Sequence, residues 1–424
     1  MNEQEGYSIE PVKKRIYAFI DIFSIWVGAG IGIGEIWAGA TLSPALPLFV
    51  AIIVNIVGHA IGNLILGAVA IEGAETGLPT MVLSRGAFGI KGSALPSILN
   101  YVQLIGWTGI MIIVGAKAMN AIFEHGFINY YFWVLFFGII VTIWTLIGPE
   151  KWKGIEKISA LLLLILSIWI IYVTLHEYSL NELLSHKPTG EIGTMLGLDL
   201  VIAMPLSWVP LIADYSRFCK NKKSSFYGSY IGYFISSGLM YFVGSLSNTA
   251  YGKEDPISIL VAYGFGIPAM IIVIFSTTTT TFLDIYSGAI TYKNVFTKSN
   301  VKKQIIIVGM LGTALATVFP TGKYEAFLLF VGGAFISMAA IMIVDYFFIK
   351  KGYVAGELFK KEGKYWYKNG FNLKAILIWL IGFIFYLLLT MQIPFFGYVG
   401  SKIGASIPTF ALVAFLYYLF NTPK

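Results

Sequence analysis

Twelve apolar runs, each long enough to cross a lipid bilayer as a helix, follow one another along this sequence of 424 residues. Their approximate centres are Ile31, Leu64, Ile105, Gly138, Ile165, Ser207, Met240, Thr279, Gly312, Ser337, Phe383 and Val413. About twenty apolar residues suffice for a transmembrane helix, and in lipid only helices or closed barrels satisfy their backbone hydrogen bonds. The charged fraction of 12% is about half that of a soluble domain. The sequence therefore predicts an all-α integral membrane protein with twelve transmembrane helices.

Lysine and arginine gather on one side of the predicted membrane. One set of connecting segments holds the basic stretches at residues 13–15, 85–91, 151–157, 217–223, 293–303 and 350–374. The opposite set holds only Lys117, Lys187, Lys253, Lys323 and Lys402. This is the positive-inside pattern, so both termini are predicted to be cytoplasmic in the plasma membrane. The net charge of +7 thus orients the chain in the lipid bilayer and does not indicate a nucleic-acid partner.

Residues 1–424 are expected to form one membrane domain, with no soluble domain and no cleavable signal peptide. The longest connection, residues 350–372, is a basic aromatic loop, either an ordinary cytoplasmic connection or a contact for anionic headgroups. A single cysteine, Cys219, excludes an intramolecular disulfide and a multi-cysteine metal site. The four histidines are scattered, and His59 is interpreted as a hydrogen-bonded interhelical residue rather than a proton relay. Because no nucleophile–base pair or metal cluster is evident, an enzyme is not expected.

The first apolar run, residues 17–42, is interrupted at its centre. Gly28, Gly30, Gly32 and Gly34 alternate there, and Glu35 follows them directly. Each glycine weakens a helix by about 1 kcal/mol relative to alanine, and a broken helix at membrane depth is typical of a secondary transporter's binding site. Close helix packing is the alternative explanation, although packing glycines usually recur every four residues.

Glu35 is a candidate substrate-binding residue, together with Gly34 beside it. A carboxylate in mid-membrane is costly, by about 2.5–3.5 kcal/mol on insertion scales, so it is expected to face a cavity or a partner. It could accept hydrogen bonds from a ligand or carry a proton. Alternatively, it could only bond the loosened backbone of the first or sixth span.

The span count suggests two inverted repeats of five helices, spans one to five in residues 16–175 and spans six to ten in residues 194–349. Residues 373–420 would then add spans eleven and twelve. In this arrangement span six corresponds to span one, and it contains Pro205 and Pro210. Proline removes a backbone donor and clashes with the preceding turn, so both prolines are expected to break or kink span six.

Polar and aromatic residues within spans three, six and eight are further candidates. Gln103 and Trp107 lie in span three, and Ser207 and Trp208 lie between the two prolines. Span eight carries Ser276, five consecutive threonines at 277–281, and Asp284. Threonine hydroxyls bind hard cations such as sodium through oxygen, but they also bond back to their own helix. The tryptophans could stack on a flat ligand or merely anchor and pack.

Three motifs resemble the nucleobase–cation symporter family of cytosine, uracil, allantoin and hydantoin permeases. They are TGLPTMVLSRGAFGIKGSALPSILNYVQLIGWTG (76–109), ADYSRFCKN (213–221) and GGAFISMAAIMIVDYFFIKKGYV (332–354). The stretches MPLSWVPLIADYSR and TTTTTFLDIYSG look most like the hydroxymethylpyrimidine permeases linked to thiamine-precursor uptake. The resemblance implies a LeuT-like five-plus-five inverted repeat with two extra C-terminal helices.

The resemblance also implies site residues. The family's substrate-stacking tryptophan falls on Trp107, whereas its second aromatic falls on Pro205, a departure that leaves Trp208 as the substitute. The family's asparagines on span eight are replaced in a region that holds Asp284. The implied sodium ligands are Gly28, Ile31, Ser276, Thr279 and Thr280.

These features predict a symporter that imports a small planar nitrogen heterocycle, most closely hydroxymethylpyrimidine or a related thiamine precursor. A permease for cytosine or another nucleobase is the alternative within transport. A membrane receptor that binds such a ligand without moving it is the alternative from another class, and the lack of a signalling domain argues against it. No cofactor is expected beyond a coupling ion, sodium or a proton, and the chain is expected to function as a monomer.

Overall fold

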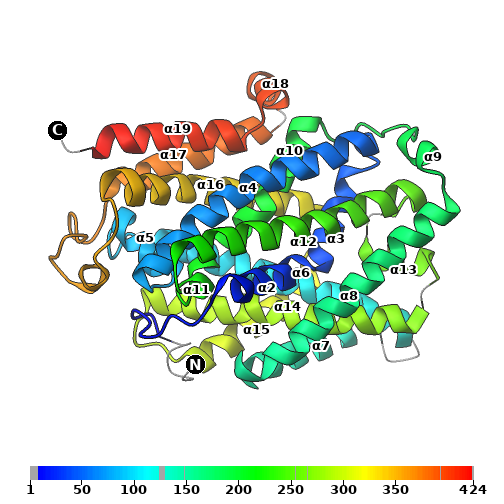
Figure 1. The fold of residues 1–424 in the computed structure, drawn as a ribbon, viewed down its shortest axis with the longest axis horizontal. Helices are drawn as coiled ribbons and strands as arrows, with labels where there is room; N and C mark the ends of the chain where they lie inside the picture. The colour runs from blue at the N-terminus through cyan, green and yellow to red at the C-terminus, as the bar shows by residue number, and fades with distance from the viewer. Residues whose placement is uncertain are drawn as a thin grey trace.

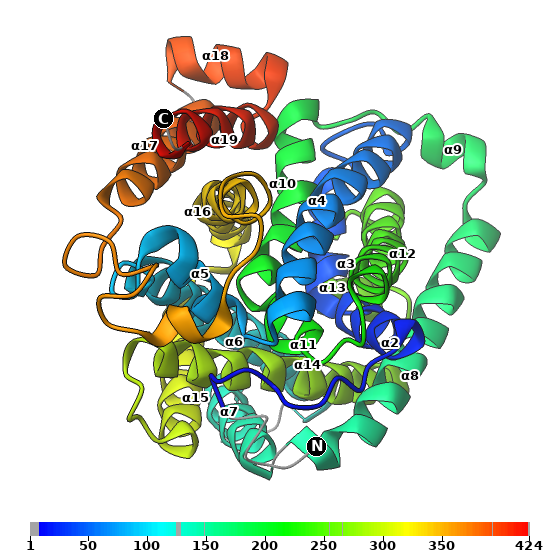
Figure 2. The same ribbon diagram turned by 60° about the vertical axis from the view of Figure 1, so that its left-hand side comes forward.

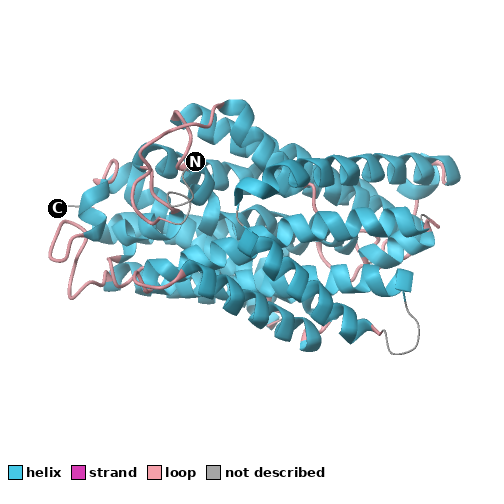
Figure 3. Ribbon diagram, turned by 90° about the horizontal axis from the view of Figure 1, so that it is seen from below, coloured by secondary structure: helices cyan, strands magenta, loops and turns pink. Residues whose placement is uncertain are grey.

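The computed structural model describes residues 8–422 except 124–128, 148, 254, 265 and 392; the side chains of residues 149–156, 279 and 321 are also outside the description. The described chain is helical throughout, as Figure 3 shows. Strand-like pairing is limited, in this described part, to two isolated bridges, Tyr17 with Cys219 and Lys368 with Phe371. The prediction of an all-α protein is confirmed.

The helices of the first half are α2 (Phe19–Gly30), α3 (Ile33–Leu42), α4 (Leu48–Thr76), α5 (Thr80–Phe88), α6 (Ala94–Phe123), α7 (Tyr130–Ile147), α8 (Pro149–Glu177) and α9 (Leu180–Leu184). Those of the second half are α10 (Thr194–Trp208), η1 (Val209–Leu211), α11 (Ile212–Ser216), α12 (Lys222–Tyr251), α13 (Pro256–Ala262), α14 (Gly266–Val295), α15 (Val301–Val318), η2 (Thr321–Lys323) and α16 (Tyr324–Ile343). The chain ends with η3 (Val344–Ile349), η4 (Ala355–Phe359), α17 (Leu373–Thr390), α18 (Pro394–Ile403) and α19 (Ser406–Asn421).

A helix or a bent helix pair lies at each of the twelve predicted spans. Among the described residues, nine helices are long and apolar enough to cross a membrane, and two bent pairs, α2 with α3 and α18 with α19, raise the number to as many as eleven. The one predicted span that this count leaves out corresponds to α12. This helix has 30 residues but is less apolar because it carries seven serines. It lies against α2, α3 and α4, where several serines bond to neighbouring backbone.

The first span is broken at Ile31 and Gly32, with a bend of 59° between α2 and α3. The break is narrower than the glycine pattern predicts, because α2 continues through Gly28 to Gly30. Gly34 and Glu35 consequently belong to the first turn of α3. Close packing against α12 contributes as well, since a side chain at Gly244 would lie 1.9 Å from the carbonyl oxygen of Ile36.

The sixth span is interrupted by the short 3-10 helix η1. Pro210 lies inside this segment, whereas Pro205 is accommodated within α10. Of the two prolines that were predicted to break or kink the span, Pro210 therefore lies at the break, whereas Pro205 does not break the helix. Its ring packs against Gly62 of α4, where an added Cβ would come within 2.3 Å of it.

Figure 2 shows how the helices are grouped around this broken core. The helices α17 and α19 lie beside α16 at one edge, with α18 outermost. The helix α6 packs along α14, α2 and α3 both pack on α12, and α3 also contacts α14. His59 of α4 contacts the Asn55 carbonyl oxygen (2.9 Å) and the Ser237 hydroxyl (2.8 Å), which confirms its interpretation as a hydrogen-bonded interhelical residue.

The start of the described chain, the 350–372 loop and the end of α19 lie at the same end of the bundle (Figure 1). The loop is folded onto α5 rather than free, because Tyr367 donates to the Gly86 carbonyl (2.6 Å) and Asn372 donates to the Ala87 carbonyl (2.7 Å). The backbone amide of Val12 reaches the carbonyl of Gly77 at the same end. The two ends of the described chain at one end of the bundle agree with an even number of membrane crossings. The side of the membrane that this end faces stays a prediction.

Candidate functional site: a cavity between the broken spans

A cavity lies where the breaks of the first and sixth spans meet α6 and α14. Its lining residues are Gly32, Gly34, Glu35, Leu104, Trp107, Met111, Met204, Ser207, Trp208, Leu211, Thr280 and Asp284. About 420 Å³ of the space between and around these residues, open solvent included, is not filled by atoms. Six of the seven residues predicted to bind substrate line this cavity, and Gln103 is the exception. The wall also holds Thr280, which was predicted to bind sodium.

Glu35 is held in place by a hydrogen-bond chain that joins the first and sixth spans. The indole N–H of Trp208 donates to the hydroxyl of Tyr233 (2.8 Å), and this hydroxyl donates to Glu35 Oε1 (3.0 Å). The other carboxylate oxygen, Oε2, lies 2.2 Å from the position that a Cβ on Gly32 would occupy. A side chain at Gly32 would therefore have to displace the Glu35 carboxylate, which lies over the N-terminal turn of α3. The positive end of the helix dipole favours a negative charge at that point.

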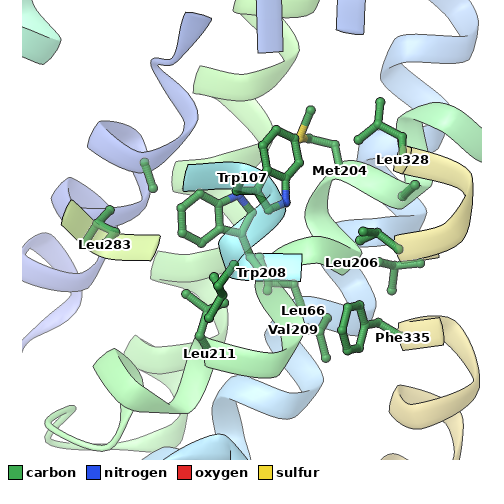
Figure 4. Packing of buried hydrophobic residues seen from close by; sticks show 14 of the residues in the cluster. Leu66, Trp107, Met204, Leu206, Trp208, Val209, Leu211, Leu283, Leu328 and Phe335 are labelled. Atoms are coloured by element: carbon green, nitrogen blue, oxygen red, sulfur yellow. The ribbon is translucent and has the colours of Figure 1, made fainter. Parts of the chain in front are cut away.

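Two indoles, Trp107 and Trp208, line the cavity, and Figure 4 shows them near Met204 and Leu211. Trp107 is packed edge-to-face against Phe327 (5.3 Å between ring centroids) and Tyr324 (6.1 Å). Tyr324 donates to the carbonyl of Gly34 (2.9 Å), so it fixes the backbone just after the break.

Trp208 is held in place by contacts on the side of the indole away from the cavity. It meets Trp26 of α2 edge-to-face at 5.6 Å, in addition to its bond to Tyr233. Both indoles are 8% exposed, so each is rigidly packed yet retains some open surface. Such surfaces suit stacking on a flat ring.

Gln103 supports the break of the sixth span instead of lining the cavity. Its amide nitrogen donates to the carbonyl of Ser207 and to the side-chain oxygen of Asn100, both at 2.8 Å. Gln103 is fully buried. We interpret Gln103 as a residue that holds the C-terminal end of α10 in position. The sequence had instead predicted that it contacts substrate.

Asp284 and Thr280 bring α14 to the cavity, one helical turn apart. The carboxylate of Asp284 has no hydrogen-bond partner among the residues that the structure describes, although the residue is only 5% exposed. Glu35 and Asp284 both line this cavity.

The threonine run shows the back-bonding that was the alternative to ion binding. Thr277, Thr278, Thr280 and Thr281 each donate to the carbonyl four residues earlier. A hydroxyl that donates its hydrogen in this way keeps oxygen lone pairs that can face a cation. Back-bonding therefore does not exclude an ion site.

The other predicted sodium ligands lie outside the cavity wall. Gly28 and Ile31 line a separate groove between α2 and α8, and Ser276 is buried one turn before Thr280. The side chain of Thr279 is outside the described residues. In the described part of the chain no group of three or more His, Cys, Asp or Glu residues could hold a metal ion.

Tyr233 and Tyr324 were not predicted from the sequence. Tyr233 lies in the serine-rich α12, and Tyr324 begins α16. The chain has 25 tyrosines, so residue type alone does not distinguish these two. Tyr233 contacts Glu35 across 198 positions and Trp208 across 25, and Tyr324 contacts Gly34 across 290.

Comparison with known proteins identifies the family. The family model described as "Permease for cytosine/purines, uracil, thiamine, allantoin" matches residues 9–403. The chain belongs to this permease family. The predictions that it is a membrane transporter, and not an enzyme, are thereby confirmed.

Relatives with assigned names are distant. The chain is 24% identical to the cytosine permease of Escherichia coli, over 83% of this chain and 84% of that protein. It is also 24% identical to the hydantoin permease of Microbacterium maritypicum, over 94% of this chain and 86% of that protein.

Solved structures show the same fold. Mhp1, a nucleobase-cation-symport-1 family transporter in a closed conformation with bromovinylhydantoin bound, matches with a TM-score of 0.83. The match has 20% identity and covers 97% of this chain and 93% of Mhp1. A Na+-coupled sialic acid symporter matches with a TM-score of 0.57 at 12% identity, over 97% of this chain and 100% of that one. These matches confirm the predicted LeuT-like fold.

Proposed function

We propose that this permease is a cation-coupled symporter for a small planar nitrogen heterocycle, with hydroxymethylpyrimidine or a related thiamine precursor as its substrate. The observation that carries the proposal is the cavity itself, which brings two indoles and two carboxylates together at two broken spans. Indole faces stack on flat rings, and carboxylates accept hydrogen bonds from exocyclic amines. The family description, which includes thiamine, supports this substrate class.

Sodium is the proposed coupling ion, bound by carbonyl oxygens of Gly28 and Ile31 and by oxygens of Ser276, Thr279 and Thr280. Support comes from the break after Ile31, which frees backbone carbonyls from helix bonding. Ion and substrate would favour the same conformation, so that each raises the affinity for the other. The permease would act as a monomer in the plasma membrane, with both termini cytoplasmic and residues 16–175 and 194–349 as its inverted repeats.

Uptake into proteoliposomes tests the proposal. Radiolabelled 4-amino-5-hydroxymethyl-2-methylpyrimidine should accumulate when a sodium gradient points inward, and it should not accumulate when potassium replaces sodium. A proton gradient applied alone distinguishes proton coupling. Binding without accumulation under either gradient would instead favour a receptor.

A permease for cytosine is the second candidate, because the chain is similar to the cytosine permease of Escherichia coli. Cytosine also carries an exocyclic amine, so it could use the same carboxylates. Competition decides between the two candidates. If unlabelled cytosine displaces the labelled hydroxymethylpyrimidine at lower concentration than hydroxymethylpyrimidine itself, cytosine is the better substrate.

A further inference from the structure

The polar side chains that line the cavity are almost all hydrogen-bond acceptors. Glu35 and Asp284 contribute carboxylates, and none of the described lining residues is lysine, arginine or histidine. The Ser207 hydroxyl donates its hydrogen to the carbonyl of Met204 (2.6 Å), and Thr280 donates to the carbonyl of Ser276 (3.0 Å). Both hydroxyls therefore turn only lone pairs toward a ligand.

The donors near the cavity are largely occupied. The Trp208 N–H bonds to Tyr233, and the Tyr233 hydroxyl bonds to Glu35. The N-terminal turn of α3 is covered by the carboxylate of Glu35 above Gly32. Among the described side chains of the wall, the N–H of Trp107 is the donor that no protein acceptor occupies.

The two carboxylates differ in how they are held. Glu35 is anchored by Tyr233 and by the start of α3, whereas Asp284 is 95% buried and has no hydrogen-bond partner in the described part of the chain. A buried carboxylate without a partner is strongly destabilising. The missing partner is best supplied by something that enters the cavity.

We infer that this cavity selects planar ligands with a cationic, donor-bearing edge, an amidinium or a protonated aminopyrimidine, and that Asp284 is the residue that reads this edge. The amino group and the protonated ring nitrogen of such a ligand present two parallel N–H donors. A carboxylate accepts both donors at once, as it does from arginine. A ligand that presents carbonyl oxygens instead would face two carboxylates with only the Trp107 N–H as a compensating donor, which disfavours its binding.

This inference rests on the proposed function, since it names the charge class of the substrate for the same site. Two matched probe pairs test it. Benzamidine is a flat amidinium cation at neutral pH, and benzamide is its neutral counterpart of nearly equal shape. The second pair is 4-amino-5-hydroxymethyl-2-methylpyrimidine and its 4-oxo analogue.

Binding is measured on the purified full-length protein by isothermal titration calorimetry, first without any substitution. We expect wild type to bind benzamidine at least tenfold more tightly than benzamide, and the aminopyrimidine at least tenfold more tightly than the oxo analogue. Equal or reversed preference in both pairs would overturn the inference.

The variant Asp284→Asn keeps the size of the side chain and removes the charge. It should reduce the preference within each pair to less than threefold, while Glu182→Gln, which neutralises an exposed carboxylate on α9, should leave it unchanged. If Asp284→Asn does not fold, Asp284→Glu keeps the charge and should retain the preference. An unchanged preference in Asp284→Asn would show that another group reads the ligand.

Failure of the inference and failure of the proposed function give different results. If proteoliposomes accumulate neutral oxo heterocycles as well as amino heterocycles, the permease function stands and the charge selectivity is wrong. If no heterocycle of either kind accumulates or competes, the proposed function itself is wrong.

Discussion

Tyr233 provides the most direct test of the structure, because one hydroxyl joins two residues of the cavity. In Tyr233→Phe the ring remains, but the acceptor for the Trp208 N–H and the donor to Glu35 are both lost. All three residues are at least 92% buried. A buried donor without a partner costs about 1–3 kcal/mol, and a bond to a charged group contributes about 1.5–3 kcal/mol.

We expect Tyr233→Phe to lower the free energy of unfolding by about 2–4 kcal/mol. The estimate is below the full sum of roughly 2.5–6 kcal/mol, because water in the cavity can replace part of the bonding to Glu35. Binding of the aminopyrimidine should also weaken about tenfold, since both the stacking indole and the carboxylate lose their orientation. Unfolding is followed in mixed micelles by titration with sodium dodecyl sulfate, and binding is followed by calorimetry.

Tyr241→Phe is the matched control on the same helix. Tyr241 is as deeply buried as Tyr233, but its hydroxyl has no hydrogen-bond partner in the described structure. Removing an unsatisfied hydroxyl should be neutral or slightly stabilising. If both variants unfold at the same detergent fraction as wild type and bind ligand equally well, the hydrogen-bond chain from Trp208 to Glu35 is not a stabilising feature of the protein.

Four further predictions concern the ligand, the ion and the membrane. Trp107→Ala should weaken heterocycle binding more than tenfold in calorimetry, because burial and stacking of roughly 0.5–1.5 kcal/mol are lost together, while Trp107→Phe should retain part of the affinity; equal binding in both variants and wild type would exclude stacking there. Thr280→Val keeps the shape but removes an oxygen, so uptake should lose its sodium stimulation, and unchanged stimulation would argue for proton coupling. Glu35→Gln should alter ligand preference or flatten the pH profile of uptake, whereas wild-type behaviour in both assays would make Glu35 purely structural. Gly356→Cys, at a position with open space around Cβ, should resist an impermeant thiol reagent in intact cells in a Cys219→Ser background, and labelling from outside would reverse the proposed orientation.

The features that could be predicted from the sequence were residues that are unfavourable within a membrane helix. Glu35 stands out because a charge at membrane depth is costly, and Asp284 stands out for the same reason. The glycine run predicted a break in the first span, which the structure places at Ile31 and Gly32. In each case the sequence carries an unfavourable local element that only a special environment can accommodate.

Long-range partnerships could not be predicted in this way. Tyr233 meets Glu35 across 198 positions, and Tyr324 meets Gly34 across 290. Apolar periodicity sets which face of a helix is buried, but it does not specify the residue opposite. Gln103 illustrates the same limit: a polar residue in a span indicates an important contact, while only the fold shows that the contact is the Ser207 carbonyl.

The hydrogen-bond chain from Trp208 through Tyr233 to Glu35 would provide a physical basis for the proposed coupling between substrate and ion. A ligand stacked on Trp208 would act on the end of α10, where the indole N–H bonds to Tyr233 and Tyr233 bonds in turn to Glu35 in the first turn of α3. The Glu35 carboxylate lies over Gly32, and the preceding residue in the chain, Ile31, supplies a carbonyl to the proposed sodium site. Substrate and ion would thus act on the two sides of one break, and a conformation that satisfies both would be favoured by each. On this argument Tyr233→Phe should reduce the dependence of substrate affinity on sodium as well as the affinity itself. A variant that loses affinity equally with and without sodium would place the coupling elsewhere in the protein.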